Sequence, residues 1–301
     1  IMSAGFGLDG DLVPVVSYVN TLNNIGGSVV VTFQSVSGLL SFGDDDQTTL
    51  NALPVDAEFA DFNGDGYEDV ALSLPDSISQ ILVLVNGGMS GSRWNGFTSS
   101  KQFSAGDTSA GLAVGDLDSD GDLDIVVANT VDDTVTVLMN VWDTNSTLGF
   151  TKPIADIPTD WYGGATLSAL PKDVAIGNFH TTTSVDIAVA NSGDGMMAII
   201  NGPILAASFM PGGSNHSTGG GAEAIDPTDV NDDRDLDKVV VTGADGKTSV
   251  FKSAASAFGL VLEYDEPDVY DVGDGISEQV IADVDGNGWN DLIVADNVGN
   301  S

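Results

Sequence analysis

The chain has 301 residues, of which 45 are acidic and 8 are basic, and its formal net charge is −37. Eight Lys and Arg residues cannot neutralise a run of phosphates, which argues against nucleic-acid binding and against attachment to an anionic membrane. No apolar run approaches the ~18 residues of a transmembrane helix, so direct membrane insertion is not expected. The 42% of hydrophobic residues is nevertheless enough for a folded core.

An acidic turn followed by a β-branched run recurs along the chain. Full copies occupy residues 61–69, 116–124, 229–237 and 283–291, and degenerate copies begin at Gly5 and Asn178. The turns therefore start near residues 5, 61, 116, 178, 229 and 283, at a pitch of 51 to 62 residues. This regularity predicts that residues 1–301 form a single repeat domain.

Each unit has the same predicted order of strands. A short strand precedes the turn, at 57–60, 110–114, 173–176 and 279–282, and a second strand follows the turn. A third strand is predicted at 81–85, 135–139 and 197–200, and a variable fourth segment such as 98–103 ends the unit. Four strands in about 50–60 residues are typical of a β-propeller blade. We therefore predict an all-β propeller that has six or seven blades when complete.

The full turns carry oxygen-bearing side chains at positions 1, 3, 5 and 9, counted from the first residue of each turn. Calcium is a hard cation that takes six to eight oxygen ligands, and a tight loop brings such side chains to one point. Gly at position 6 permits the sharp bend, and position 7 can add its backbone carbonyl. The turns thus favour calcium, although Asp-Gly and Asn-Gly are also ordinary hairpin turns when they occur singly.

The turns are not an EF-hand and are not equivalent to one another. Position 12 is Leu or Val where an EF-hand needs a bidentate Glu, and no helix is predicted beside the loop. The 229–237 turn has Arg234 in place of the expected Gly, which places its ion affinity in doubt. The Asn178 turn keeps only Asp186 as a carboxylate, and His180 is interpreted as a polar turn residue. No ion is expected at the Gly5 turn, so the prediction is three to four calcium ions.

The pattern of acidic turn and apolar run resembles the FG-GAP/VCBS repeats of integrin-α-type β-propellers. That resemblance covers nearly the whole chain and implies an extracellular protein with calcium in the loop between the first two strands of a blade. It implies side-chain ligands at Asp61, Asn63, Asp65, Asp69, Asp116, Asp118, Asp120, Asp124, Asp229, Asn231, Asp233, Asp237, Asp283, Asp285, Asn287 and Asp291. It further implies main-chain ligands at Tyr67, Asp122, Asp235 and Trp289. The terminal units depart from a complete member, so either the chain is part of a longer one or a neighbouring molecule completes the fold.

Catalysis is not expected, because His180 and His216 are the only histidines and neither has a suggestive context. The alternatives are a glycan-binding propeller and, more remotely, a polysaccharide-degrading enzyme. Trp94, Trp142, Trp161 and Tyr162 could stack on sugars or pack between blades. Asn145 and Asn215 head two N-glycosylation sequons. We predict a non-enzymatic, extracellular or cell-surface propeller that acts in adhesion or filament assembly, with a protein or glycan partner.

Overall fold

The computed structural model describes sixteen stretches of the chain, which carry every structural statement below. They are residues 2–4, 14–19, 28–33, 46–49, 54–74, 80–90, 93–141, 149–159, 169–179, 185–202, 213–228, 238–243, 245–252, 267–273, 276–287 and 290–296. All regular elements in these stretches are strands, which confirms the all-β prediction. Accordingly, this part of the chain contains no helix of the length and apolarity required to span a membrane.

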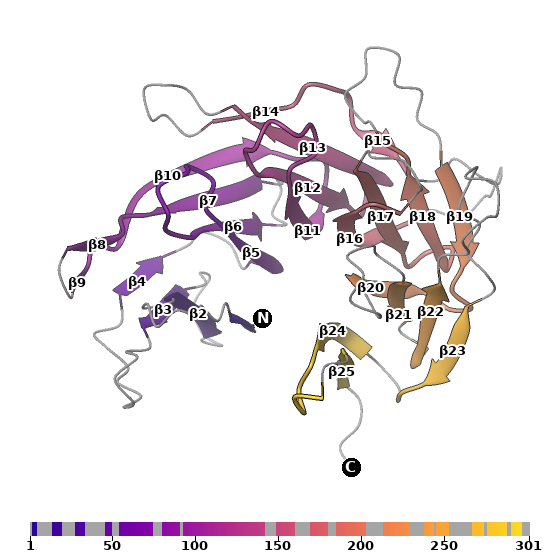
Figure 1. Cartoon of the computed structure of the whole chain (residues 1–301). Helices are drawn as coiled ribbons and strands as arrows, with labels where there is room; N and C mark the ends of the chain where they lie inside the picture. Colours follow the sequence, from indigo (N-terminus) through magenta and orange to yellow (C-terminus); the bar gives the residue numbers. More distant parts are fainter. Residues whose placement is uncertain are drawn as a thin grey trace.

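The first three sheets follow the order of the sequence (Figure 1). The first has the order β1-β2-β3-β4, with strands Met2–Ala4, Pro14–Val19, Ser28–Phe33 and Asp46–Thr49. The second contains β5 (Asp56–Ala60), β6 (Asp69–Leu74), β7 (Gln80–Asn86) and β10 (Phe97–Ser104), and a hairpin of β8 (Met89–Ser90) and β9 (Arg93–Trp94) lies between its last two strands in the chain. The third contains β11 (Ser109–Gly115), β12 (Asp124–Asn129), β13 (Thr134–Asn140), β14 (Phe150–Thr151) and β15 (Ile157–Pro158).

The last three sheets repeat this order. The fourth contains β16 (Pro171–Gly177), β17 (Asp186–Asn191), β18 (Met196–Ile200) and β19 (Gly213–Ser217). The fifth contains β20 (Ala222–Thr228), β21 (Lys238–Gly243), β22 (Lys247–Lys252) and β23 (Asp268–Asp271). The sixth has β24 (Ile276–Ala282) and β25 (Asp291–Asp296). The first two strands of each sheet pair antiparallel, and the predicted first, third and fourth strands fall at the expected places.

Burial decreases from the second strand of a sheet to the outer strand. β6, β12 and β17 are rich in Val, Ile, Leu and Ala and are buried along their whole length, because both of their faces are covered. By contrast, β10 is mostly polar and mostly exposed, and β23 is exposed throughout. Polar outer strands protect a free sheet edge against unwanted pairing.

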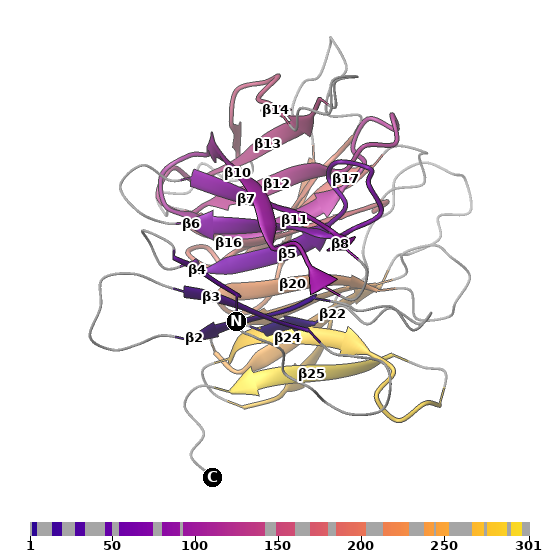
Figure 2. The same ribbon diagram turned by 90° about the vertical axis from the view of Figure 1, so that its left-hand side faces the viewer.

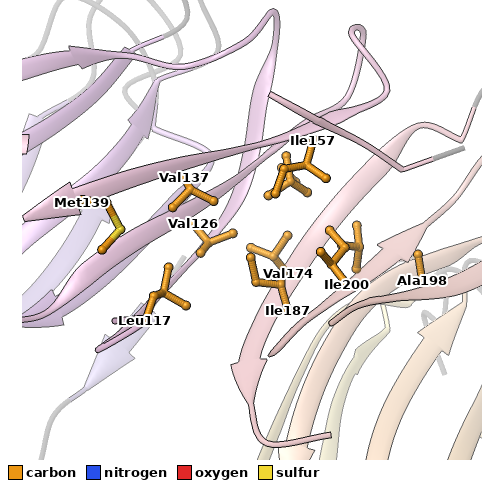
Figure 3. Packing of buried hydrophobic residues seen from close by; sticks show 12 residues of the cluster. Leu117, Val126, Val137, Met139, Ile157, Val174, Ile187, Ala198 and Ile200 are labelled. Atoms are coloured by element: carbon orange, nitrogen blue, oxygen red, sulfur yellow. The ribbon is translucent and has the colours of Figure 1, made fainter. Parts of the chain in front are cut away.

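Successive sheets pack face to face through apolar side chains. Figure 3 shows this contact between the third and fourth sheets, where Val126 and Val137 face Val174 and Ile187. A second cluster joins the second and third sheets, and a third cluster joins the fourth and fifth. The repeat unit therefore cannot bury its faces alone, and stacking supplies the core.

The innermost strands β5, β11, β16, β20 and β24 lie on the inside of the arc of sheets in Figure 1, and Figure 2 shows the same sheets from the side. Neighbours in this series contact one another, and together they surround a cavity of about 780 Å³. Such an arrangement is that of propeller blades, but the described residues show no closed ring. The number of blades and the single-domain assignment of 1–301 stay predictions.

Carboxylates link the innermost strands of neighbouring sheets. Asp56 of β5 accepts a hydrogen bond from Leu112 N of β11 at 2.8 Å, and Asp173 of β16 accepts one from Ile225 N of β20 at 3.0 Å. Between these two acids, β11 has Gly111 at the equivalent position. A Cβ at Gly111 would overlap the Asp173 side chain and would lie 2.8 Å from Lys172 O. Acidic and small residues therefore alternate along the series of innermost strands β5, β11 and β16.

We predict that Gly111→Ala lowers the free energy of unfolding by about 1–3 kcal/mol, because the new methyl group forces β11 and β16 apart. Gly149→Ala is the matched control, since its Cβ would meet only Val141 at an ordinary 3.7 Å. Urea denaturation of both variants measures the difference. Equal stability of the two variants would contradict the close approach of β11 to β16.

Candidate metal centre

The 61–69 and 116–124 turns adopt the same hydrogen-bonded loop. Asp61 Oδ1 accepts from Asp65 N at 3.0 Å and Asp61 Oδ2 accepts from Gly66 N at 2.7 Å. Asn63 Oδ1 also accepts from Asp65 N, at 2.9 Å. These bonds wrap the backbone around the first side chain and bring the position 1, 3 and 5 side chains to one side of the turn.

In the second of these turns the same contacts recur at the equivalent positions. Asp116 accepts from Asp120 N at 3.2 Å and from Gly121 N at 3.1 Å, and Asp118 accepts from Asp120 N at 3.2 Å. Carboxylate oxygens of Asp116, Asp118 and Asp120 lie within 4.8 Å of one another. Three acidic oxygens so close together, with no basic group in the turn, form a donor set suited to a hard cation.

The 283–291 turn gathers a similar group from different positions. Carboxylate oxygens of Asp283, Asp285 and Asp291 lie within 4.8 Å of one another. Asn287 N donates to both Asp283 and Asp285 at 3.0 Å, which repeats the bonds at the start of the other turns. Within the described residues, groups of three acids at this spacing occur only in the 116–124 and 283–291 turns.

Left-handed backbone occurs at two positions of the turns. Position 6 has φ of +86° at Gly66 and +95° at Gly121, as the sharp bend requires. Position 4 is also left-handed, at Gly64, Ser119 and Gly286, with φ between 64° and 72°. The sequence indicated the first of these positions and not the second, because Ser119 gives no conformational signal.

The aspartate at position 9 is held by the fold itself. Asp69, at the start of β6, is fully buried and accepts from Phe62 N at 3.2 Å and from Asn86 N at 2.8 Å. Asp124 is likewise fully buried and accepts from Leu117 N at 2.9 Å and from Asn140 N at 2.8 Å. One carboxylate thus joins the turn to the end of the third strand. A cation at this position would share the carboxylate oxygens with the two backbone N–H groups.

The Asn178 turn keeps this contact although it lacks the other acidic residues. Asp186 is fully buried and accepts from Phe179 N at 2.9 Å and from Gly202 N at 2.7 Å. The position-9 aspartate is therefore required by the sheet whether or not the turn holds an ion. Sequence reasoning assigned this position to calcium alone.

Two asparagines complete the support of the turns and were not indicated by the sequence. Asn86 Nδ2 donates to Glu68 O at 2.9 Å, and Asn140 Nδ2 donates to Leu123 O at 3.2 Å. Asn140 Nδ2 also donates to Phe62 O at 2.8 Å, which connects one turn to the next sheet. The sequence signal that could have revealed this role is the Asn that ends the third strand in both units.

Two carboxyl groups at the base of the turns, those of Asp69 and Asp124, have raised pKa values. Burial, together with the nearby charges of Asp65 and Asp61, raises the pKa of Asp69 to about 7. Burial also raises the pKa of Asp124 to about 6, with Asp118 and Asp120 contributing. Because crowded carboxylates repel one another, a bound cation would relieve this cost.

Several predicted site residues lie outside the described residues. They are Asp229, Asn231, Asp233, Asp235, Asp237, Trp289, His180, Asn145, Trp142, Trp161 and Tyr162. The backbone of Trp94 is described in β9, but its side chain is not. Tyr67 N and Asp122 N donate to Asp65 and Asp120, while the predicted role of their carbonyls stays a prediction.

The other histidine and the other sequon lie on β19. His216 Nε2 is 2.7 Å from Ser214 Oγ, and its ring meets that of Phe251 edge-on at 6.0 Å. Asn215 is half-buried and pairs with Ala198 of β18. A half-buried residue within a paired strand is a poor acceptor for a bulky glycan, so glycosylation of Asn215 stays a prediction.

Comparisons with known proteins bear on the repeat and the fold. Residues 61–127 match the model of the FG-GAP-like repeat, which confirms the expected repeat for this segment. A search of the curated proteins gives no match to the chain.

The chain is similar at low sequence identity to two solved structures. A crystal structure of BBS1N in complex with ARL6DN has a TM-score of 0.45 and 14% identity, over 77% of this chain and 61% of that chain. The outer coat vertex of COPII on membranes has a TM-score of 0.40 and 12% identity, over 88% of this chain and 74% of that chain. This chain thus spans less than two thirds of the BBS1N chain.

We predict that Asp186→Ala lowers the free energy of unfolding by about 3 kcal/mol, because two buried N–H groups lose their acceptor. Urea denaturation should give the same loss in excess calcium and in EGTA, since the Asn178 turn lacks the other acidic residues. The exposed Asp271→Ala on β23 is the control and should change little. A loss seen only in calcium would contradict the structural role of Asp186.

Proposed function

We propose that this chain, which carries an FG-GAP-like repeat at residues 61–127, is a calcium-stabilised, non-enzymatic β-propeller that acts in adhesion or surface assembly outside the cell. Its role is to present a protein-binding surface, on a scaffold whose acidic turns are held by calcium. Two features support the proposal, namely the acidic turns and the apolar surface of the last sheet.

The acidic turns support the choice of calcium. Their ligands are oxygen atoms of Asp and Asn, and no nitrogen or sulfur ligand occurs in the 61–69 and 116–124 turns. The turns already hold positions 1, 3 and 5 together by bonds to their own backbone, so binding requires little rearrangement. Exposed sites of this kind suit the weak calcium affinity of extracellular modules, with Kd values of ~10⁻⁴–10⁻³ M.

The observation that carries the assembly role is the exposure of apolar side chains on β24, β25 and the turn between them. Val284 at position 2 of its turn is 63% exposed, whereas Phe62 and Phe179 at the same position are at most 2% exposed. Ile293 at position 11 is 47% exposed, whereas Val126 at that position is fully buried. The same repeat positions thus form a core in other sheets and a surface here.

Other apolar side chains of the last two sheets are exposed as well. Leu292 of β25 is 37% exposed, and Val269 and Tyr270 of β23, the outer strand of the fifth sheet, are 51% and 53% exposed. Among the described residues, β25 pairs only with β24, so the other edge of β25 is open to pairing. An apolar face next to an open strand edge is suited to a protein partner that adds a strand. A glycan would gain less from such a face.

We predict that Asp118→Ala reduces the number of calcium ions bound per chain by one, because it removes the middle acid of the 116–124 cluster. Isothermal titration calorimetry measures the stoichiometry, and Asp271→Ala serves as the control of equal charge change. An unchanged stoichiometry for Asp118→Ala would contradict calcium binding at this turn.

We predict that the protein forms ordered assemblies in calcium that dissociate in EGTA, as seen by electron microscopy. Ile293→Lys should abolish them, because a charge on the apolar face opposes burial. Val131→Lys is the matched control, since Val131 is 57% exposed on a turn of the third sheet. Discrete monomers that lose only stability in EGTA would disprove the assembly role and leave a glycan array as the next experiment.

A further inference from the structure

The cavity between the inner strands has a lining that the proposed function does not use. Its volume of about 780 Å³ lies in the range of small-molecule sites, and five of the six sheets contribute to its wall. The strands that line it, β5, β11, β16, β20 and β24, lie on the inside of the arc in Figure 1, and of the lining residues only Asn290 belongs to an acidic turn. It is therefore a distinct place at which this fold can hold a ligand.

The ionisable groups of the wall are unbalanced in charge. The lining includes five carboxyl residues and a single basic residue, Lys172; the five are Asp56, Glu58, Asp173, Glu223 and Asp226. These groups come from three different strands and belong to repeat units far apart in the sequence. One ammonium group cannot balance five carboxyl groups, so the wall as a whole attracts a positively charged ligand.

The carboxyl groups of the wall fall into two classes. Asp56 and Asp173 already accept backbone N–H groups of the adjacent inner strands, and their role is to join the sheets. Glu223 interacts with the charge of Lys172, and Asp226 with the side chain of Gln279. Glu223 and Asp226 lie three residues apart on β20, and Glu223 is close enough to Lys172 to be affected by its charge.

Burial makes the charged form of these groups costly. It raises the pKa of Asp226 to about 6, and it raises the pKa of Glu223 against the opposing effect of Lys172. A positively charged ligand would offset that cost, as a paired charge does in a partly desolvated site.

The spacing of the wall groups argues against a single metal ion. Within the described residues, sets of three acidic groups close enough to share one ion occur in the turns and not in the cavity. A ligand that reaches several separated carboxylates must be extended and must carry several N–H donors. Aliphatic polyamines and guanidinium compounds have both properties.

We propose that the cavity binds an extended organic cation of the polyamine class. Glu223 and Asp226 are its principal hydrogen-bond acceptors, and the ammonium group of Lys172 competes with the ligand for the carboxylate of Glu223. The methylene groups of such a ligand match the apolar part of the wall, which includes Val55, Leu112 and Val174. The site is independent of the proposed assembly surface.

The test is isothermal titration calorimetry with spermidine at saturating calcium, so that the acidic turns are occupied and do not contribute. The wild type should bind one spermidine, and Glu223→Gln/Asp226→Asn should weaken binding by at least about tenfold, which is ~1.4 kcal/mol. Asp271→Asn, an exposed acid on β23, is the control and should bind as the wild type does.

Lys172→Gln gives a second measurement of opposite sign. Removing the competing ammonium group should tighten spermidine binding several-fold, and this variant retains both acceptors even if the double variant fails to fold. Absence of binding to the wild type would overturn the proposal. Equal weakening by Asp271→Asn, or no tightening in Lys172→Gln, would also overturn it, because binding would then reflect net charge alone.

Discussion

The hydrogen bonds accepted by the buried position-9 aspartate set the geometry of three of the sheets. In three sheets its buried carboxylate accepts one N–H from the acidic turn and another from the end of the third strand, as Asp124 does with Leu117 and Asn140. The turn, the second strand and the third strand are thereby fixed relative to one another. The apolar faces of β12 and β17 can then be presented to neighbouring sheets in a constant orientation.

Cohesion between sheets comes from two sources that act at different depths. Apolar clusters fill the space between the sheets, and carboxylates of the innermost strands accept N–H groups of the next innermost strand. The first source is non-directional and tolerates variation, whereas the second fixes the register of adjacent strands. A chain with few basic residues thus uses several of its acids as acceptors for the backbone, in addition to ion pairs such as Lys152–Asp156.

Much of this architecture could be predicted from the sequence. The pitch of the acidic turns located the strands on either side of them, because a β-branched run after a Gly-containing turn has few alternatives. The bonds that connect distant segments could not be predicted. Asn140 reaches Phe62 across 78 residues, and Leu112 meets Asp56 across 56, so no local pattern reveals either contact. The role of Asp186 was obscured for a related reason, since a carboxylate that accepts two N–H groups looks the same in sequence as one that binds a metal.

Acidic and small residues alternate from one innermost strand to the next, and this makes neighbouring units inequivalent. Asp56 and Asp173 reach forward to the next strand, while Gly111 between them leaves room for the acid that follows. The pattern of acidic and small residues therefore repeats every two sheets rather than every sheet. Duplicating or deleting a single unit would bring two acids or two small residues side by side, whereas a change of two units would preserve the alternation. Growth of such a chain during evolution is expected to have proceeded more readily by pairs of units than by single ones.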